Sequence, residues 1–129
     1  SLEIAIKELK ATESRITRLR DHLEAELLKI DNTRVNGNIK KRLYNVSNIC
    51  FNGADADAIM AGLKSIMVSN GSACTSTKIE PSHVLKAIGL SDEDAYSSIR
   101  FSLGKYNTDE EIATTIREVT RVVEELKVM

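Results

Sequence analysis

The sequence has 129 residues, of which 42% are hydrophobic and 29% charged, a composition that fits one globular domain and excludes a disordered or collagen-like chain. Eighteen basic and nineteen acidic residues leave a net charge of −1, so no overall field draws the chain to nucleic acid or to an anionic membrane. The longest uncharged stretch, Ser65 to Thr77, is too short to span a bilayer, and no signal-peptide pattern is present. We therefore expect a cytoplasmic protein without a direct nucleic-acid or membrane partner.

The first element predicted is one long amphipathic helix. Its apolar residues recur at steps of three and four, with a single gap of seven, at Leu2, Ile6, Leu9, Ile16, Leu19, Leu23, Leu27 and Ile30. Such a helix is roughly 40 Å long, more than a domain of this size needs for its own core. We expect part of it to pack on protein that this sequence lacks, and the start at Ser1, already inside the pattern, to be a cut.

Two strands are predicted next, Thr33 to Val35 and Tyr44 to Phe51. The second is apolar and mostly buried, and its side chains alternate between two sides, with Val46 and Cys50 on one and Ile49 and Phe51 on the other. The basic run from Lys40 to Arg42 between the strands is expected to be a solvated loop and not a binding patch.

A helix capped by Asp55 and Asp57 is predicted to follow, with an apolar face of Ile59, Met60, Leu63 and Met67. Ile66 to Ser69 is predicted to be a short strand. The segment from Asn70 to Thr77, which contains Cys74, has almost only small side chains and no periodicity. It is predicted to be a mobile loop.

The last third of the chain is predicted to hold two short helical segments, a strand and a long helix. Pro81 suits the first position of a helix over Ser82–Ile88 that Gly89 ends, and a second short turn begins at Ser91. Ser98 to Leu103 alternates, with Ile99, Phe101 and Leu103 on one face and Ser98, Arg100 and Ser102 on the other. Thr108 and Glu111 form the capping box of a final helix whose apolar residues are Ile112, Ile116, Val119, Val123 and Leu126.

Helices with a few short strands between them, and no regular strand–helix–strand alternation, predict an α+β fold. We expect a small antiparallel sheet with helices covering one face.

Cys74 and Arg100 are the residues with the clearest chemical potential. A cysteine in a polar loop of small residues is an ordinary thiol or a nucleophile whose thiolate reaches solvent and swings toward a partner. Arg100, on the non-core face of its strand, makes a surface ion pair or clamps a carboxylate with its two-pronged donor set. Cys50, in an apolar run, is expected to be core packing, and a bridge between the two cysteines is unsupported.

Other site types are disfavoured. His22 and His83 receive no role, the two cysteines match no zinc-ligand spacing, and Gly71-Ser72 lacks the spacing and the Lys-Ser/Thr ending of a phosphate loop. We therefore expect neither a metal site nor nucleotide binding.

Three segments follow one another along the chain: VSNGSACTS at 68–76, EPSHVL at 80–85 and SSIRFSLG at 97–104. In this order they resemble the active-site loop and following segments of bacterial cysteine desulfurases, members of the class-V aminotransferase family. Residues 43–51, LYNVSNICF, are similar to the strand before the first helix of the family's small domain, although a proline is usual where Tyr44 stands. The long form of the loop is similar to that of the housekeeping and nitrogen-fixation branch, which passes sulfur to iron-sulfur scaffold proteins and to tRNA thiolation.

The resemblance implies the small C-terminal domain of an aminotransferase-like fold, in residues 31–129, with residues 1–30 linking it to an absent large domain. It also implies that L-cysteine is converted to L-alanine, that Arg100 pairs with the substrate carboxylate, and that Cys74 takes the sulfur as a persulfide. The cofactor, pyridoxal phosphate, belongs to the large domain with its Schiff-base lysine, and none of the ten lysines here stands in that context. We expect a homodimer for the whole enzyme and no activity for this chain alone.

Two further hypotheses remain at this stage. The chain is a stand-alone sulfur carrier or interaction module that receives persulfide on Cys74, or it is a degenerate domain that keeps only the fold.

Overall fold

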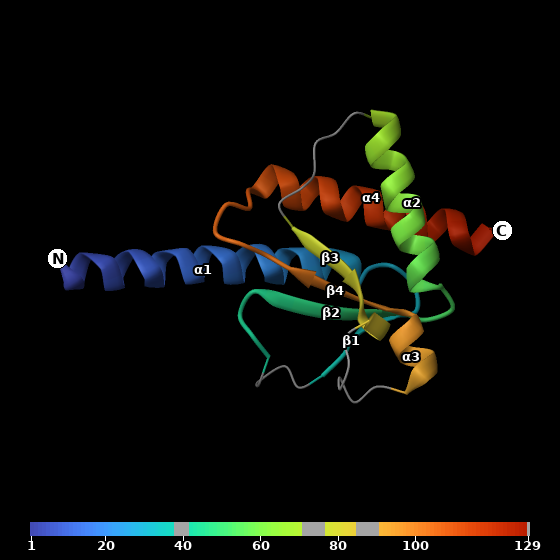
Figure 1. The fold of residues 1–129 in the computed structure, drawn as a ribbon, viewed down its shortest axis with the longest axis horizontal. Coiled ribbons are helices and arrows are strands. Elements are labelled where there is room, and N and C mark those ends of the chain that lie inside the picture. The colour runs from blue at the N-terminus through green and yellow to red at the C-terminus, as the bar shows by residue number, and fades with distance from the viewer. Residues whose placement is uncertain (38–41, 71–76, 85–90, 129) are drawn as a thin grey trace.

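The computed structural model describes residues 1–37, 42–70, 77–84 and 91–128, and only the backbone at 66–70 and 128. The elements along this part of the chain (Figure 1) are α1 (Leu2–Leu27), β1 (Thr33–Val35), β2 (Val46–Phe51), α2 (Ala56–Asn70), β3 (Lys78–Pro81), the 3₁₀ turn η1 (Ser82–Val84), α3 (Asp92–Tyr96), β4 (Ser98–Ser102) and α4 (Asp109–Val128). The α+β class predicted from the sequence is confirmed.

The four strands form one antiparallel sheet in the order β1-β2-β4-β3. The connection from β2 through α2 to β3 leaves room for β4, which inserts between them as the last strand of the chain. In this register Arg100 lies opposite Asn48 on one neighbour and Glu80 on the other. Successive side chains of a strand point to opposite sides, so these three residues share one face of the sheet.

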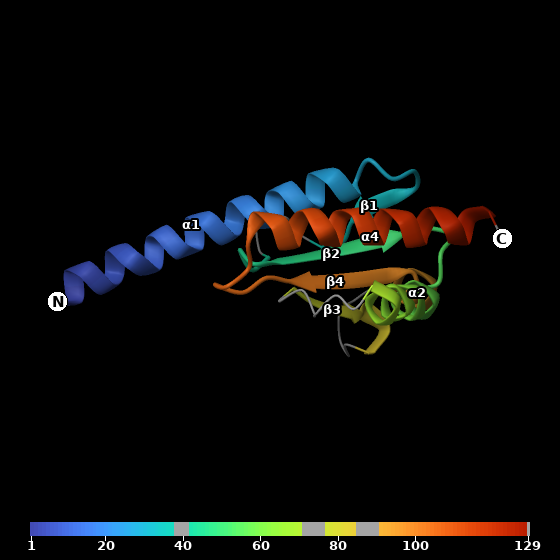
Figure 2. The ribbon, with the colours of Figure 1, turned by 90° about the horizontal axis from the view of Figure 1, so that it is seen from above.

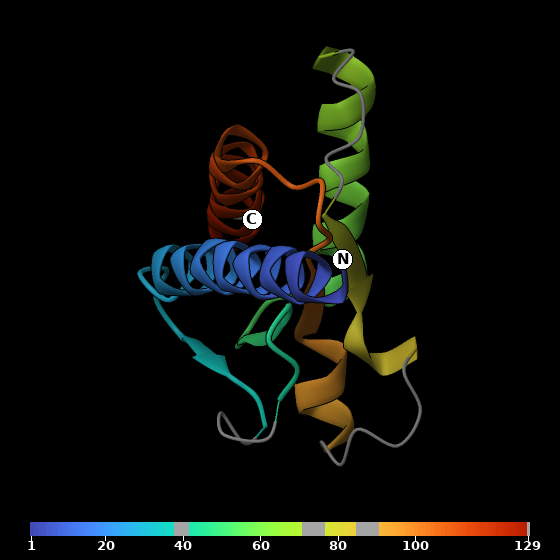
Figure 3. The same cartoon turned by 90° about the vertical axis from the view of Figure 1, so that its left-hand side faces the viewer.

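Three helices, α1, α2 and α4, cover one face of the sheet (Figures 2 and 3). Phe51 and Phe101 meet edge to face beneath them, with ring centroids 6.5 Å apart. Around this pair lies the core, which is formed by Ile16, Leu19, Leu23, Leu27, Ile49, Ile59, Ile99, Ile112, Val119 and Val123 among others. The opposite side of the sheet, here called the polar face, carries Arg34, Asn48, Cys50, Lys78, Glu80, Ser98, Arg100 and Ser102.

The two halves of the long helix α1 lie in different environments. Its second half contributes buried residues to the core, whereas its first half extends past the ends of the strands (Figures 1 and 2). Four large apolar side chains on that half are between 43% and 77% exposed: Leu2, Ile4, Ile6 and Leu9. Buried apolar residues at helical spacing fix the second half to this domain, while residues 1–11 are all exposed.

The caps predicted at Asp55 and Thr108 are present in the structure, whereas Asp57 lies inside the first turn of α2 and its carboxylate contacts His83. Asp55 accepts hydrogen bonds from the backbone N–H groups of Asp57, at 2.7 Å, and Ala58, at 3.3 Å. At the start of α4 the N–H of Glu111 donates to Thr108 Oγ1 at 3.2 Å, and the N–H of Thr108 donates to Glu111 Oε1 at 3.1 Å. The turn expected from Ser91 is the short helix α3, capped by the Ser91 hydroxyl.

The strand predicted at Ile66 to Ser69 is wrong, because α2 continues through it to Asn70. The run Ile-Met-Val is apolar and β-prone, but no glycine or proline stands between Gly62 and Gly71 to interrupt the helix there. In turn, Lys78–Pro81 is a strand that the sequence analysis did not predict. Pro81 ends that strand and does not begin a helix, since an edge strand tolerates the missing N–H.

Two other expectations change. Ser82–Val84 is a 3₁₀ turn and not the first turn of an α-helix, and residues 85–90 of the helix predicted to end at Gly89 lie outside the described residues. Arg42 is not solvated: its side chain is 15% exposed and forms an ion pair with Glu24 of α1. Lys40 and Lys41 lie outside the described residues.

Candidate functional site

Cys74, the sulfur-accepting residue expected from the sequence, lies outside the described residues. The described chain stops at Asn70, the last residue of α2, and resumes at Thr77, directly before β3. Thr77 is buried, and its Oγ1 accepts a hydrogen bond from Asn107 Nδ2 at 3.1 Å. The return of this segment to the sheet is therefore fixed one strand away from the strand that carries Arg100.

Arg100 lies on β4, one of the two inner strands, and projects from the polar face as its alternation predicted. Its Nη2 donates to Glu80 Oε2 of β3 at 2.7 Å, and the two side chains are 33% and 23% exposed. Lys78 Nζ lies 3.4 Å from the other carboxylate oxygen of Glu80. One carboxylate thus lies between two cations, and the trio keeps one net positive charge.

The electrostatics of Glu80 follow from this arrangement. The hydrogen bond from Arg100 is the main cause that holds the pKa of Glu80 below its ordinary value, and partial burial opposes it only in part. Glu80 is therefore ionised at neutral pH and acts as a fixed counter-ion. Glu80 was not predicted from the sequence as a site residue, because Lys78–Pro81 was not predicted to be a strand and only the strand register brings Glu80 to Arg100.

The guanidinium of Arg100 is only partly used by Glu80. Of its three nitrogens, Nη2 has the carboxylate, while Nε is sealed from solvent and has no hydrogen-bond partner among the described residues. A guanidinium presents five N–H donors in a planar fork that matches a carboxylate. A sealed Nε cannot reach a ligand, but Nη1 makes no hydrogen bond within the described residues and is not among the sealed atoms. Arg100 therefore keeps donor capacity at its terminal nitrogens, and the ion pair and the carboxylate clamp predicted from the sequence are compatible.

Beside Arg100, four neutral side chains on the polar face form one hydrogen-bonded cluster. Asn48 Oδ1 accepts from Asn36 Nδ2 at 3.1 Å and from Ser82 Oγ at 2.9 Å. Asn36 Nδ2 also donates to Ser98 Oγ at 2.8 Å, and Ser98 Oγ donates to the backbone oxygen of Asp94 at 2.6 Å. Ser82 and Ser98 are fully buried, so this cluster is a fixed part of the face.

Cys50 and His83 have surroundings that fit a structural role and not a catalytic one. Cys50 is a free thiol and fully buried, as expected, but it lies on the polar face of the sheet and outside the hydrophobic cluster beneath the helices. His83 stacks on Tyr96 at a centroid distance of 4.3 Å, and its Nε2 lies 2.8 Å from Asp57 Oδ1, so its side chain is only 17% exposed. This contact ties η1 to α3 and to the start of α2.

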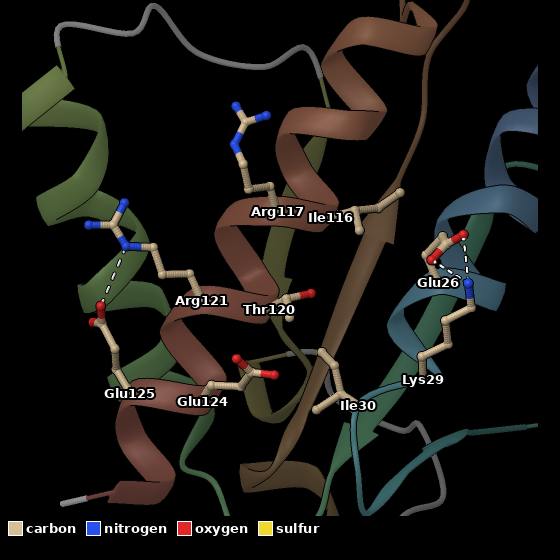
Figure 4. A pocket seen from close by; sticks show the side chains of 9 residues that line it. All are labelled: Glu26, Lys29, Ile30, Ile116, Arg117, Thr120, Arg121, Glu124 and Glu125. Carbon is tan, nitrogen blue, oxygen red and sulfur yellow. Dashed lines mark hydrogen bonds and ion pairs between the residues drawn. The ribbon is translucent and has the colours of Figure 1, made fainter.

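A groove lies between the end of α1 and α4, on the helical side of the sheet (Figure 4). Its walls carry Glu26, Lys29, Ile30, Ile116, Arg117, Thr120, Arg121, Glu124 and Glu125. Most of the charges pair with a neighbour, such as Lys29 with Glu26 at 2.9 Å and Arg121 with Glu125 at 3.4 Å. The groove lies on the side of the sheet opposite Arg100, and its lining includes no thiol and no histidine.

The described residues do not fit a pyridoxal phosphate site. A lysine that forms a Schiff base needs a desolvated setting that lowers its pKa, and each described lysine is exposed: Lys7, Lys10, Lys29, Lys64, Lys78, Lys105 and Lys127. No group of three or more His, Cys, Asp or Glu side chains within the described ranges could hold a metal ion. No helix among the same residues is long and apolar enough to cross a membrane.

Comparison with known proteins gives one family. The family described as "Aminotransferase class-V" matches residues 2–114. Cysteine desulfurase IscS of Shewanella frigidimarina is 44% identical over 126 residues, and that of Histophilus somni is 48% identical over 124. These alignments cover 98% and 96% of this chain but only 31% of each relative, so the chain spans less than a third of their length.

Two solved structures contain a region with the same fold as this chain. A NifS-like protein superposes with a TM-score of 0.70 at 25% identity, over 96% of this chain and 31% of the other. The NifS-like protein from Rickettsia africae gives a TM-score of 0.67 at 32% identity, over 87% of this chain and 29% of the other. In each case this chain corresponds to one part of a larger molecule.

Proposed function

This chain belongs to the class-V aminotransferase family, and from that premise we propose that it is the C-terminal part of a cysteine desulfurase. Its similarity to proteins named as cysteine desulfurases extends over nearly its whole length, while it spans 31% of theirs. The single structural observation that supports the proposal most is Arg100, an arginine of the polar face whose guanidinium is paired on one nitrogen only.

In the proposed reaction, L-cysteine and the Cys74 thiol give L-alanine and a persulfide on Cys74. The thiolate of Cys74 bonds to the substrate sulfur, the carbon–sulfur bond of the substrate breaks, and the carbon that loses sulfur ends with a proton in its place. No external oxidant or reductant is needed, because the substrate carbon is reduced as the two sulfur atoms join. Arg100 binds the substrate carboxylate, which fits a planar donor set held in place by Glu80.

Pyridoxal phosphate, the cofactor of this reaction, would supply an electron sink for the substrate when bound to the whole enzyme. We assign it to the part of the enzyme that this chain does not span, because the described residues do not fit it. Residues 1–30 then link that part to a small domain of residues 31–129. The second half of α1 packs in the core of the small domain, and its exposed apolar first half packs on the rest of the enzyme. By the same proposal this chain has no activity alone, and the whole enzyme is a homodimer.

The persulfide must leave the enzyme to be of use. We propose that an iron-sulfur scaffold protein or another sulfur acceptor, including one that serves tRNA thiolation, takes it from Cys74. A nucleophile that collects sulfur in one pocket and delivers it at another surface has to move between them. Cys74 lies between α2 and β3 in the chain.

The proposal is tested on the full-length enzyme loaded with pyridoxal phosphate and supplied with L-cysteine. Alanine release gives turnover, and alkylation followed by mass spectrometry of the peptide that contains Cys74 gives the persulfide. Cys74→Ala is expected to abolish both, whereas Cys50→Ala, the matched change at the chain's other cysteine, keeps them. Equal alanine release by wild type and Cys74→Ala would overturn the assignment of the sulfur acceptor. Persulfide that reaches Cys74 only from a separate donor, without alanine, would make this protein a sulfur carrier.

Arg100→Gln is expected to raise the KM for L-cysteine about 10- to 100-fold, because a hydrogen bond to a charged group contributes about 1.5–3 kcal/mol. An unchanged KM would refute the role of Arg100 in binding the carboxylate.

A further inference from the structure

Asn48 is the polar-face residue directly opposite Arg100 on β2. The backbone hydrogen bonds between β2 and β4 indicate whether the side chains of Asn48 and Arg100 lie close together. The N–H of Phe51 donates to the oxygen of Ser97, and the N–H of Leu103 donates to the oxygen of Asn45. Hydrogen-bonded pairs alternate with non-hydrogen-bonded pairs along an antiparallel ladder, so Asn48 and Arg100 form one of the latter, in which the side chains are closer.

The amide of Asn48 has a defined orientation. Its carbonyl oxygen accepts two hydrogen bonds, from Asn36 and from the buried hydroxyl of Ser82, which fixes that end of the group in the polar cluster. Its Nδ2 makes no hydrogen bond within the described residues, and it is not among the polar atoms sealed from solvent without a partner. An amide NH₂ carries two donors. Within the described part of the chain, both donors of the Asn48 amide therefore lack an acceptor, and they lie next to the guanidinium of Arg100.

We propose that Asn48 is a second substrate-binding residue, which donates a hydrogen bond from Nδ2 to the carboxylate that Arg100 pairs with. This inference rests on the proposed function, because it needs an amino acid carboxylate on the polar face. A carboxylate has two oxygens, and a guanidinium already bound to Glu80 on one nitrogen has fewer donors left for them. A neutral amide adds a donor without adding charge.

The chemical consequence is selectivity for a ligand with a carboxylate. Arg100 alone attracts any anion, because most of its effect is charge. An amide held by two hydrogen bonds at its oxygen offers a donor at one fixed position. It therefore strengthens the binding of a carboxylate whose second oxygen reaches that position. Loss of Asn48 is therefore expected to reduce the discrimination between L-cysteine and its decarboxylated analogue, cysteamine.

The test uses the full-length enzyme with its cofactor and with Cys74→Ala, so that no persulfide forms on residue 74. Dissociation constants for L-cysteine and for cysteamine are measured by calorimetry with and without Asn48→Ala. We expect Asn48→Ala to weaken binding of L-cysteine about tenfold, which corresponds to about 1.4 kcal/mol, and to change binding of cysteamine less than twofold. Equal weakening of both ligands, or of neither, would overturn the inference.

A second variant separates binding from structure. Asn48→Asp keeps an acceptor for Asn36 and Ser82 but replaces the donor by a negative charge, so it is expected to weaken L-cysteine binding more than Asn48→Ala does. If Asn48→Asp binds L-cysteine as tightly as Asn48 does, the side chain donates nothing to the carboxylate and the inference fails.

The same titrations with Arg100→Gln distinguish a failure of the role proposed for Asn48 from a failure of the role proposed for Arg100. If Arg100→Gln reduces the preference for L-cysteine over cysteamine and the Asn48 variants do not, only the role of Asn48 is wrong. If Arg100→Gln also leaves the preference unchanged, the carboxylate does not bind at this face, and the proposed role of Arg100 fails with it.

Discussion

The Glu24–Arg42 ion pair joins α1 to the segment before β2, and its loss is expected to destabilise the domain strongly. Glu24 accepts from both terminal nitrogens of Arg42, and its Oε1 also accepts from Ser47 Oγ at 2.8 Å. The two ionic side chains are only 14% and 15% exposed. In Glu24→Gln the charge of Arg42 stays in place without its counter-ion, next to the buried Arg20.

Removal of one partner of a buried ion pair costs about 3–5 kcal/mol. Because both side chains keep some contact with water, we expect a value at the lower end, about 3 kcal/mol, and a fall of roughly 10 °C in the unfolding midpoint for a chain of this length. Urea unfolding of the chain followed by circular dichroism measures the change. Arg18→Gln removes an ion pair with Asp109 whose side chains are 58% and 73% exposed, and it should leave the midpoint nearly unchanged.

The pH dependence gives an independent check. Burial alone would raise the pKa of Glu24, but the hydrogen bonds from Arg42 and Ser47 outweigh it and hold the pKa below its ordinary value. A carboxyl group with a lowered pKa in the folded state stabilises that state above its unfolded pKa, and the contribution is lost as the pH falls through the folded pKa. The difference between wild type and Glu24→Gln should therefore be largest at neutral pH and shrink below the ordinary pKa of 4.5. A difference under about 1 kcal/mol at pH 7, or one that stays constant down to the acid transition, would refute this account.

Three other changes test the packing by the same unfolding measurement. Phe101→Ala removes a fully buried ring from the centre of the core and should cost about 3–5 kcal/mol; a loss under 1 kcal/mol would contradict its central position. Gly62→Val should cost about 1–3 kcal/mol, because even a Cβ at this position would lie 2.6 Å from Val122 Cγ1, and adding Val122→Ala should recover part of the loss. Thr108→Ala removes the capping hydroxyl of α4 and should cost about 1 kcal/mol, whereas Thr108→Ser should cost much less.

Most of the helices could be predicted from the sequence because each has a strong local pattern. The capping box at Thr108 and the heptad-like apolar spacing after it identify α4, and eight apolar residues at regular steps identify α1. The alternation around Arg100 likewise identified which face of β4 it lies on.

The remaining features depend on contacts between segments far apart in the chain. Pro81 is compatible with a helix start or with the end of an edge strand, and only the sheet decides between them. Glu80 and Asn48 carry no local signal of function, because their positions beside Arg100 follow from the strand order and register. Arg42 stands in a basic run that is typical of a loop, yet its partner lies on a helix 18 residues earlier.

Both edge strands of the sheet are short, and this limits how the sheet can be extended by another molecule. They have three residues in β1 and four in β3, and β3 ends in a proline that has no N–H to offer and begins with an exposed lysine. A strand from another molecule would find few hydrogen-bonding groups in line at either margin, and at β3 it would meet a positive charge. We therefore expect any self-association of the separated chain to proceed through the apolar side chains near Leu2 and Leu9, and not by extension of the sheet toward fibrils.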